Sequence, residues 1–161
     1  MGNYYFVYRQ FTLKVGCELQ GFFQRYLMLY RPLIRKLNDL LAAYDLSYSL
    51  WTVILYVKNN EKTMLVDISN HFNIEKPTVT RSVKRLEENG IVMQVPGKDK
   101  REKIIQLTDF GEEIYQSCRQ KITELEFEVM KGIPLEEQKA AFQLLPKLRE
   151  NIINEEGRQN D

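Results

Sequence analysis

The sequence has few cysteines and no long apolar run. Cys17 and Cys118 are the only cysteines among 161 residues, too few for a disulfide scaffold or a cysteine-rich metal motif. The strongest apolar stretch, residues 50–57, is far shorter than the roughly 20 residues of a membrane helix. Residues 1–19 lack the apolar core of a signal peptide. These features predict a cytoplasmic chain without a membrane segment.

The sequence also lacks the signals of an active site. It contains no phosphate-binding glycine loop, no metal-ligand spacing and no nucleophile paired with a histidine. His71 is the only histidine, and without a cluster of ligands around it we interpret it as a packing or capping residue. We therefore expect neither an enzyme nor a bound metal or cofactor.

What the sequence does have is a cationic helix. Residues 77–88 follow a period of 3.6, which sets Val79, Val83 and Leu86 on one side and Arg81 and Lys84 on the other. Slim residues at the start of such a helix and long donors farther along suit a major groove of double-stranded DNA. The predicted contacts on this helix are Lys76, Pro77, Thr78, Thr80, Arg81, Lys84 and Arg85.

A basic hairpin follows this helix. Asn89 and Gly90 predict a helix stop, and residues 91–95 and 103–107 have strand composition. Pro96 and Gly97 start the turn between them, whose tip contains Lys98, Asp99, Lys100 and Arg101. A basic tip beside a basic helix suits the neighbouring minor groove. Together the helix and hairpin predict a winged helix-turn-helix.

The order of these pieces resembles the MarR family of bacterial transcriptional regulators. The matching residues are Asp67 to Ser69, Thr78 to Arg81, Leu86 to Ile91, Asp99 to Arg101 and Leu107 to Gly111. The resemblance implies that residues 77–88 are the recognition helix, that Arg101 enters the minor groove and that Asp99 orients Arg101. Glu75 replaces the usual cap of the recognition helix. Met64 replaces the cap of the preceding helix, so we expect Thr63 to cap one residue early.

Apolar stripes at steps of three and four predict long helices on both sides of this region. The stripes contain Phe23, Leu27, Tyr30, Ile34, Leu37, Leu41 and Tyr44, then Gly111, Ile114, Cys118, Ile122, Leu125 and Val129, and finally Ala141, Leu145, Leu148 and Ile152. Ser47 and Thr108 are expected caps, and Pro146 is expected to kink the last helix or divide it. Because the central domain is too small to cover these stripes, we expect a two-fold homodimer.

The predicted fold is mainly α with a small β-hairpin wing, and it combines a winged helix-turn-helix with N- and C-terminal dimerisation helices. We expect an N-terminal extension over 1–18, either disordered or an arm, and a tail over 156–161. Residues 19–45 and 112–155 form the expected dimerisation region, and 46–111 the DNA-binding domain. Residues 108–161 carry 7 basic and 12 acidic groups, against 8 and 5 in 75–107, so the C-terminal third should face away from DNA.

Two kinds of regulation remain open. Many members of the family bind small aromatic molecules, and the resemblance extends this to a cleft lined by Tyr44, Tyr48, Trp51 and Tyr56, although such residues are more often core. Some members sense peroxide through an N-terminal cysteine, which makes Cys17 a candidate redox site. We predict a DNA-binding regulator, a repressor on a near-palindromic operator, with thiol sensing and a protein-interaction winged helix as alternatives.

Overall fold

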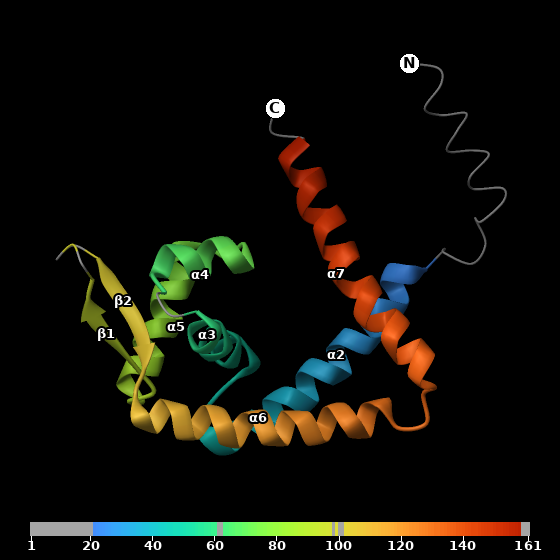
Figure 1. The fold of residues 1–161 in the computed structure, drawn as a ribbon, viewed down its shortest axis with the longest axis horizontal. Helices are drawn as coiled ribbons and strands as arrows, with labels where there is room; N and C mark the ends of the chain where they lie inside the picture. Colours follow the sequence, from blue (N-terminus) through green and yellow to red (C-terminus); the bar gives the residue numbers. More distant parts are fainter. Residues whose placement is uncertain (1–20, 61–62, 98, 100–101, 159–161) are drawn as a thin grey trace. The chain divides into compact units, whose positions relative to one another are not determined.

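The computed structural model describes residues 21–60, 63–97, 99 and 102–158 (Figure 1). The chain divides into two compact units, Met1–Cys118 and Arg119–Asp161. The division falls within the helix Asp109–Met130. The first unit contains every described element before that helix together with its start, and the second contains the rest of it and the last helix.

Helices make up most of the described chain. They are α2 (Phe22–Leu41), the short 3-10 helix η1 (Ala42–Tyr44), α3 (Tyr48–Asn59), α4 (Leu65–Phe72), α5 (Lys76–Glu88), α6 (Asp109–Met130) and α7 (Leu135–Arg158). Between α5 and α6, strands β1 (Val92–Pro96) and β2 (Lys103–Leu107) pair antiparallel, with Val92 opposite Leu107 and Pro96 opposite Lys103. This mainly helical chain with one hairpin has the predicted fold class.

Two of the predicted helix caps are confirmed. The Ser47 hydroxyl accepts a hydrogen bond from the backbone N–H of Leu50 at 3.3 Å and starts α3. The Thr108 hydroxyl accepts one from the N–H of Gly111 at 2.9 Å at the start of α6. A side-chain oxygen here satisfies a backbone donor that has no partner within the helix, which fixes where each helix begins.

The predicted cap of α4 is wrong. Met64 is the N-cap residue, and its own N–H donates to the carboxylate of Asp67 at 2.8 Å. Thr63 is fully buried, and its carbonyl accepts from the N–H of Ile105 at 2.7 Å. The segment before α4 therefore extends along β2, and this sheet contact determines the position of Thr63 more strongly than the helix end does.

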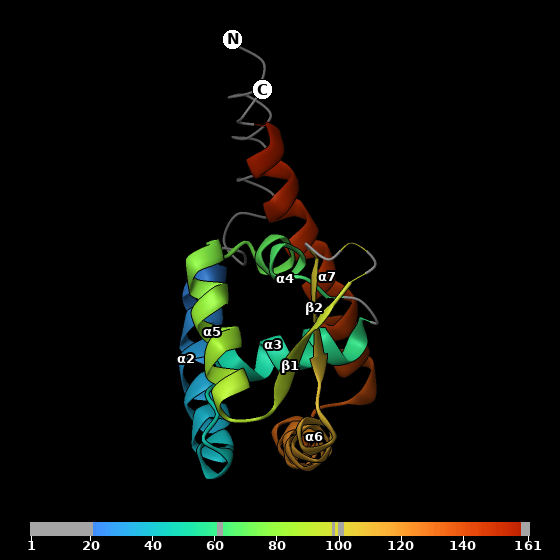
Figure 2. The same cartoon turned by 90° about the vertical axis from the view of Figure 1, so that its left-hand side faces the viewer.

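Four helices and one strand contribute side chains to the core of the first unit, namely α2, α3, α4, α5 and β2. Each core side chain named here is at most 1% exposed to solvent: Leu41, Ile54, Ile68, Leu86 and Ile105. Each contributes about 1.5–3 kcal/mol relative to an exposed position. Figure 2 shows the hairpin beside α5, with α3 behind both. The side of α5 that faces away from the buried Val79, Val83 and Leu86 is left exposed.

The two prolines within helices do not interrupt them. Pro32 stands inside α2 and Pro146 inside α7, and α7 continues unbroken over 24 residues. The predicted division of α7 at Pro146 is therefore wrong. A proline removes one backbone hydrogen bond and crowds the preceding turn, and a helix of this length keeps the bonds on either side.

The N-terminal half of α2 exposes its apolar side. Leu37 and Leu41 are buried, whereas Phe23 is 68% exposed and Leu27 is 52% exposed. Within the described residues no single helix is long and apolar enough to span a membrane; α2 with η1 reaches that length and composition only when joined to α3, across a bend of 76°. The apolar stripe predicted for residues 22–44 is thus covered at one end only.

In the second unit, the last part of α6 and α7 also expose apolar side chains. Gly132, with a φ of 81°, lies in the turn between them, and the Gln138 amide donates to the carbonyl of Ile133 at 2.8 Å. The large exposed apolar residues of this unit are Phe127, Val129, Ile133, Leu135, Phe142, Leu144, Leu145, Ile152 and Ile153. Apolar surface of this extent marks an interaction face more often than a bare surface.

Candidate nucleic-acid interface

Helix α5 separates its apolar and cationic residues as its sequence predicted. Val79, Val83 and Leu86 are buried against the core. The cationic side chains of Arg81 and Lys84 are exposed, as are Lys76, Pro77, Thr78, Thr80 and Arg85. All seven predicted contact residues therefore lie on the accessible surface of one helix, and a major groove is wide enough to admit such a helix.

The first turn of α5 is slim and has no side-chain cap. Glu75 is the N-cap residue and makes no capping hydrogen bond, because its extra methylene misplaces the carboxylate relative to the backbone donors. Pro77, in the first turn, has no N–H to satisfy. The Thr80 hydroxyl donates to the carbonyl of Lys76 at 2.8 Å. The first turn of α5 thus presents small side chains and the positive end of the helix dipole at the surface.

The three basic residues farther along α5 differ in their partners. Arg81 donates to the Pro77 carbonyl and the Thr78 hydroxyl, both at 3.4 Å and within its own helix. The ammonium of Lys84 lies 3.8 Å from the carboxylate of Glu88 one turn later. Arg85 donates to the carboxylate of Asp45 at 2.8 Å. Among the described residues, Arg81 is thus the one cation of the three without a carboxylate partner.

Sequence reasoning missed Asp45. Asp45 precedes Arg85 by 40 positions and ends η1 with a φ of 54°, a left-handed conformation that aspartate tolerates. The amide of Asn89 donates to the same Asp45 oxygen at 3.4 Å. No acidic residue stands between Lys76 and Arg85 in the sequence, so only the tertiary structure brings a carboxylate to this helix.

The end of α5 is held by the start of α6. Gly90 adopts a φ of 69°, which confirms the predicted left-handed helix stop. The Thr108 hydroxyl donates to the Gly90 carbonyl at 2.6 Å, and the Thr108 N–H donates to the Ile91 carbonyl at 3.1 Å. A Cβ on Gly111 would overlap that same Ile91 oxygen. The residues from Leu107 to Gly111 therefore hold the segment that directly follows α5.

The hairpin forms a short wing beside α5. The Gly97 N–H donates to the Glu102 carbonyl at 2.9 Å and closes the turn at its tip. The Gln94 amide donates to the Glu87 carboxylate at 3.0 Å and joins β1 to α5. Asp99 is exposed at the tip. The predicted contacts Lys98, Lys100 and Arg101 lie outside the described residues.

The residues of the predicted ligand cleft face different neighbours. The Trp51 ring is buried and stacks on Tyr115 with centroids 5.5 Å apart, whereas Tyr56 contacts His71 at 4.7 Å. Burial, followed by the nearby Tyr30 and Tyr26, raises the pKa of the Tyr48 phenol above its usual value. Tyr44 is partly exposed. A common cleft for Tyr44, Tyr48, Trp51 and Tyr56 stays a prediction.

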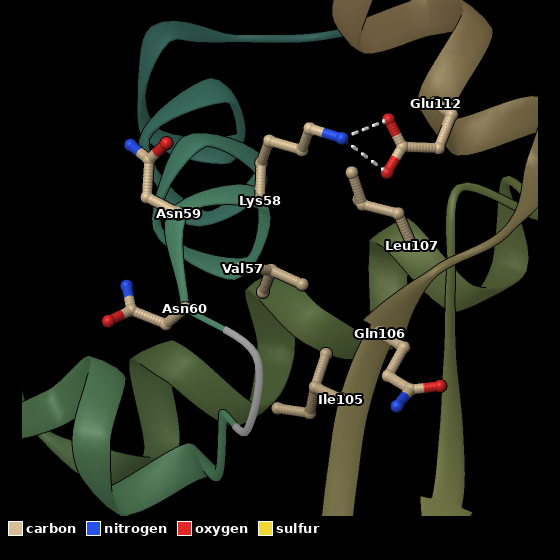
Figure 3. A pocket seen from close by; sticks show the side chains of 8 residues that line it. All are labelled: Val57, Lys58, Asn59, Asn60, Ile105, Gln106, Leu107 and Glu112. Carbon is tan, nitrogen blue, oxygen red and sulfur yellow. Dashed lines mark hydrogen bonds and ion pairs between the residues drawn. The ribbon is translucent and has the colours of Figure 1, made fainter.

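A shallow pocket lies elsewhere, at the C-terminal end of α3. It has a volume of about 300 Å³ and opens between α3, β2 and the first turn of α6 (Figure 3). The ammonium of Lys58 donates to both oxygens of Glu112, at 2.9 and 2.7 Å. Because these charges satisfy each other and both side chains are about a third exposed or more, we interpret the pair as a contact between α3 and α6 worth about 0–1 kcal/mol.

The remaining candidate residues are the two cysteines and the histidine. Cys17 lies outside the described residues, and Cys118 is buried. His71 packs against the rings of Tyr56 and Phe72, each at 4.7 Å. No group of three or more His, Cys, Asp or Glu residues suitable for a metal ion occurs in the part of the chain that the structure describes.

Comparison with known proteins matches the part of the chain that contains α3, α4 and α5. The MarR family matches residues 46–103. The uncharacterized HTH-type transcriptional regulator YwoH of Bacillus subtilis is 37% identical over 112 residues, which are 70% of this chain and 81% of that protein. An uncharacterized HTH-type transcriptional regulator of Staphylococcus aureus is 32% identical over 60% of this chain and 67% of its own length.

Solved structures share the fold. Staphylococcus aureus MarR in complex with salicylate and kanamycin has a TM-score of 0.76 and 25% identity, over 84% of this chain and 92% of that one. A mutant MarR of E. coli complexed with operator DNA has a TM-score of 0.72 and 24% identity, over 81% and 95%. With the exposed cationic helix, the wing and the relatives named above, the chain belongs to the MarR family and is a DNA-binding winged-helix transcriptional regulator.

Proposed function

We propose that this regulator is a homodimeric repressor that binds a near-palindromic operator through α5 and the wing. The observation that carries the proposal is the division of α5. Its apolar side is buried in the core, and its cationic side is exposed beside the hairpin. A repressor needs no further parts, because a dimer bound over a promoter blocks polymerase. The operator complex of the E. coli relative supports this use of the fold.

Within α5, Arg81 would read bases and Lys84 would contact phosphate. Arg81 lies opposite the buried stripe, and its planar group can donate two hydrogen bonds to a guanine edge. Lys84 is a compact charge on the same side and suits a phosphate oxygen, which carries no sequence information. Lys76, Pro77, Thr78, Thr80 and Arg85 complete the proposed contacts on the recognition helix.

The wing would provide the second contact. Lys98, Lys100 and Arg101 supply its charge, and Asp99 would orient Arg101. The attachment of β1 to α5 through Gln94 and Glu87 supports a wing that moves with the recognition helix. The narrow minor groove of A·T-rich DNA has an enhanced negative potential that favours an inserted arginine.

The exposed apolar side chains support the homodimer. In the first unit, Phe23, Leu27 and Leu29 are each more than half exposed on α2. In the second unit, Phe127, Phe142 and Leu145 are similarly exposed. A second copy would cover both sets by two-fold symmetry. Two recognition helices about 34 Å apart would then meet successive major grooves, which requires two related half-sites.

The same reasoning gives the proposed division of the chain. Residues 46–111 would bind DNA, 19–45 and 112–155 would form the dimer, 1–18 would be an extension and 156–161 a tail. A protein that binds an operator would work in the cytoplasm, where a bacterial chromosome is found.

A small aromatic effector is the proposed signal. The solved structure of the Staphylococcus aureus relative is a complex with salicylate and kanamycin, and Tyr44, Tyr48, Trp51 and Tyr56 would supply aromatic surface near α3. Such a ligand would release DNA only if it bound more tightly to a dimer whose recognition helices are wrongly spaced. Oxidation of Cys17 is the alternative signal.

A band-shift titration across salt concentrations tests the proposal. Operator DNA would first be selected from a random pool with the wild-type protein. We expect Arg81→Ala to lose about 1–3 kcal/mol on this operator and to relax its selectivity. We expect Lys84→Ala to weaken binding to all duplexes alike and to reduce the salt slope by about one. A wild-type protein with no preference among duplexes would refute DNA reading and favour a protein-interaction module.

A further inference from the structure

One basic residue of the recognition helix already has an anionic partner. The guanidinium of Arg85 donates to Asp45 at 2.8 Å, while the two side chains remain 53% and 71% exposed. Asp45 belongs to the turn after η1, so the contact joins two separate elements of the first unit. The sequence marks Arg85 as a DNA contact, and the structure gives it a competing carboxylate.

The geometry leaves Arg85 able to exchange partners. A single guanidinium nitrogen, Nη2, donates to Oδ2 of Asp45, and an arginine side chain offers five N–H donors in all. Asn89 donates to the same oxygen at the longer distance of 3.4 Å. An exposed pair of this kind is weakly held, because water and salt screen it. A phosphate, like a carboxylate, can accept two parallel hydrogen bonds from the planar guanidinium.

We propose that Asp45 competes with the DNA backbone for Arg85. In the free protein Asp45 holds Arg85, and in the complex a phosphate replaces the Asp45 carboxylate. This inference rests on the proposed function, since it requires α5 to lie on DNA. Because the exchanged contact is to a phosphate, Asp45 lowers the affinity for every duplex by a similar factor and leaves sequence preference unchanged.

The substitution Asp45→Asn tests this competition. Asparagine keeps the shape and one acceptor oxygen but removes the charge that holds Arg85. We expect binding to tighten by about 2- to 5-fold on operator and on unrelated DNA, the range expected from release of an exposed pair. Because Arg85 contacts the same phosphate in both complexes, we expect the slope of log K against log salt to change by much less than the roughly 0.9 of one additional phosphate contact.

Two controls separate release of Arg85 from a change in net charge. Asp39→Asn makes the same charge change at an exposed carboxylate on α2, and we expect a smaller gain there. In an Arg85→Ala background, Asp45→Asn should lose most of its effect. Asp45→Ser, a second variant at the same position, should reproduce the gain. Circular dichroism would verify that each variant folds.

The outcomes are distinct. Equal gains from Asp45→Asn and Asp39→Asn, or a gain that persists in the Arg85→Ala background, would overturn the competition. Weaker operator binding with unchanged binding to unrelated DNA would also overturn it, because Asp45 would then be aligning α5 for base contacts. Failure of the wild-type protein to select any duplex would instead refute the proposed function itself.

Discussion

The contact between Gly111 and Ile91 gives a sharp test of how α5 is anchored. A Cβ at position 111 would overlap the Ile91 carbonyl oxygen and lie 3.0 Å from its carbonyl carbon. Both atoms belong to the backbone, so no side chain can rotate away to make room. Gly111→Ala must therefore push the start of α6 away from the end of α5.

The expected cost follows from the hydrogen bonds that this displacement breaks. Thr108 would release the Gly90 and Ile91 carbonyls, to which it now donates at 2.6 and 3.1 Å. Each bond is worth about 0.5–1.5 kcal/mol, and overpacking adds about 1–3 kcal/mol. Alanine regains about 1 kcal/mol over glycine inside a helix. We expect the free energy of unfolding to fall by a net amount of about 1–5 kcal/mol.

Urea unfolding followed by circular dichroism measures this decrease, at one fixed protein concentration because the stability of the proposed dimer would depend on concentration. Glu113→Ala, on the exposed side of α6, is the control and should change stability by no more than about 0.5 kcal/mol. Gly90→Ala is a second comparison, because nothing lies within 4 Å of its Cβ position and only left-handed strain of about 1–2 kcal/mol applies. If Gly111→Ala is no less stable than Glu113→Ala, the reasoning about this contact fails.

Further substitutions test the cap, the core, the dimer and the thiol alternative. Ser47→Ala should cost about 0.5–2 kcal/mol in urea unfolding by removing the cap of α3, and Leu41→Ala, at a fully buried site, about 2–5 kcal/mol. Leu27→Asp should halve the mass measured by sedimentation, because a carboxylate would be buried in the proposed interface; a monomeric wild type would contradict the dimer. The thiol alternative predicts that peroxide releases DNA from the wild type and not from Cys17→Ser, so an equal response in both excludes sensing at Cys17.

Elements with strong local signals were predicted closely. The cationic helix was expected over 77–88 and α5 occupies Lys76–Glu88, and the second strand was expected and found at 103–107. In the helix the apolar residues recur with a clear period and Gly90 follows its end, whereas the strand is marked by the β-branched Ile104 and Ile105. The seven predicted contacts on α5 are exposed for the same reason, although their contact with DNA is still a prediction.

Two predictions failed, and for Thr63 the cause is a distant segment. Thr63 was expected to cap α4, but β2 takes its carbonyl as a hydrogen-bond acceptor. The division of the last helix at Pro146 was also wrong, because α7 remains one helix, while the alternative of a kink at Pro146 stays a prediction. Local rules assign a preference to each residue, and contacts between elements can outweigh a preference of about 1 kcal/mol.

The sequence by itself determined which residues face inward and which face outward, because the spacing of apolar and charged residues is a property of the chain alone. It thereby specified a cationic helix, a basic hairpin and apolar helices in excess of what one small core can cover. Only the tertiary structure decided the partners of these residues. Asp45 reaches Arg85 from 40 positions away, and Gly111 meets the backbone of Ile91, because folding brings together residues that no local pattern connects.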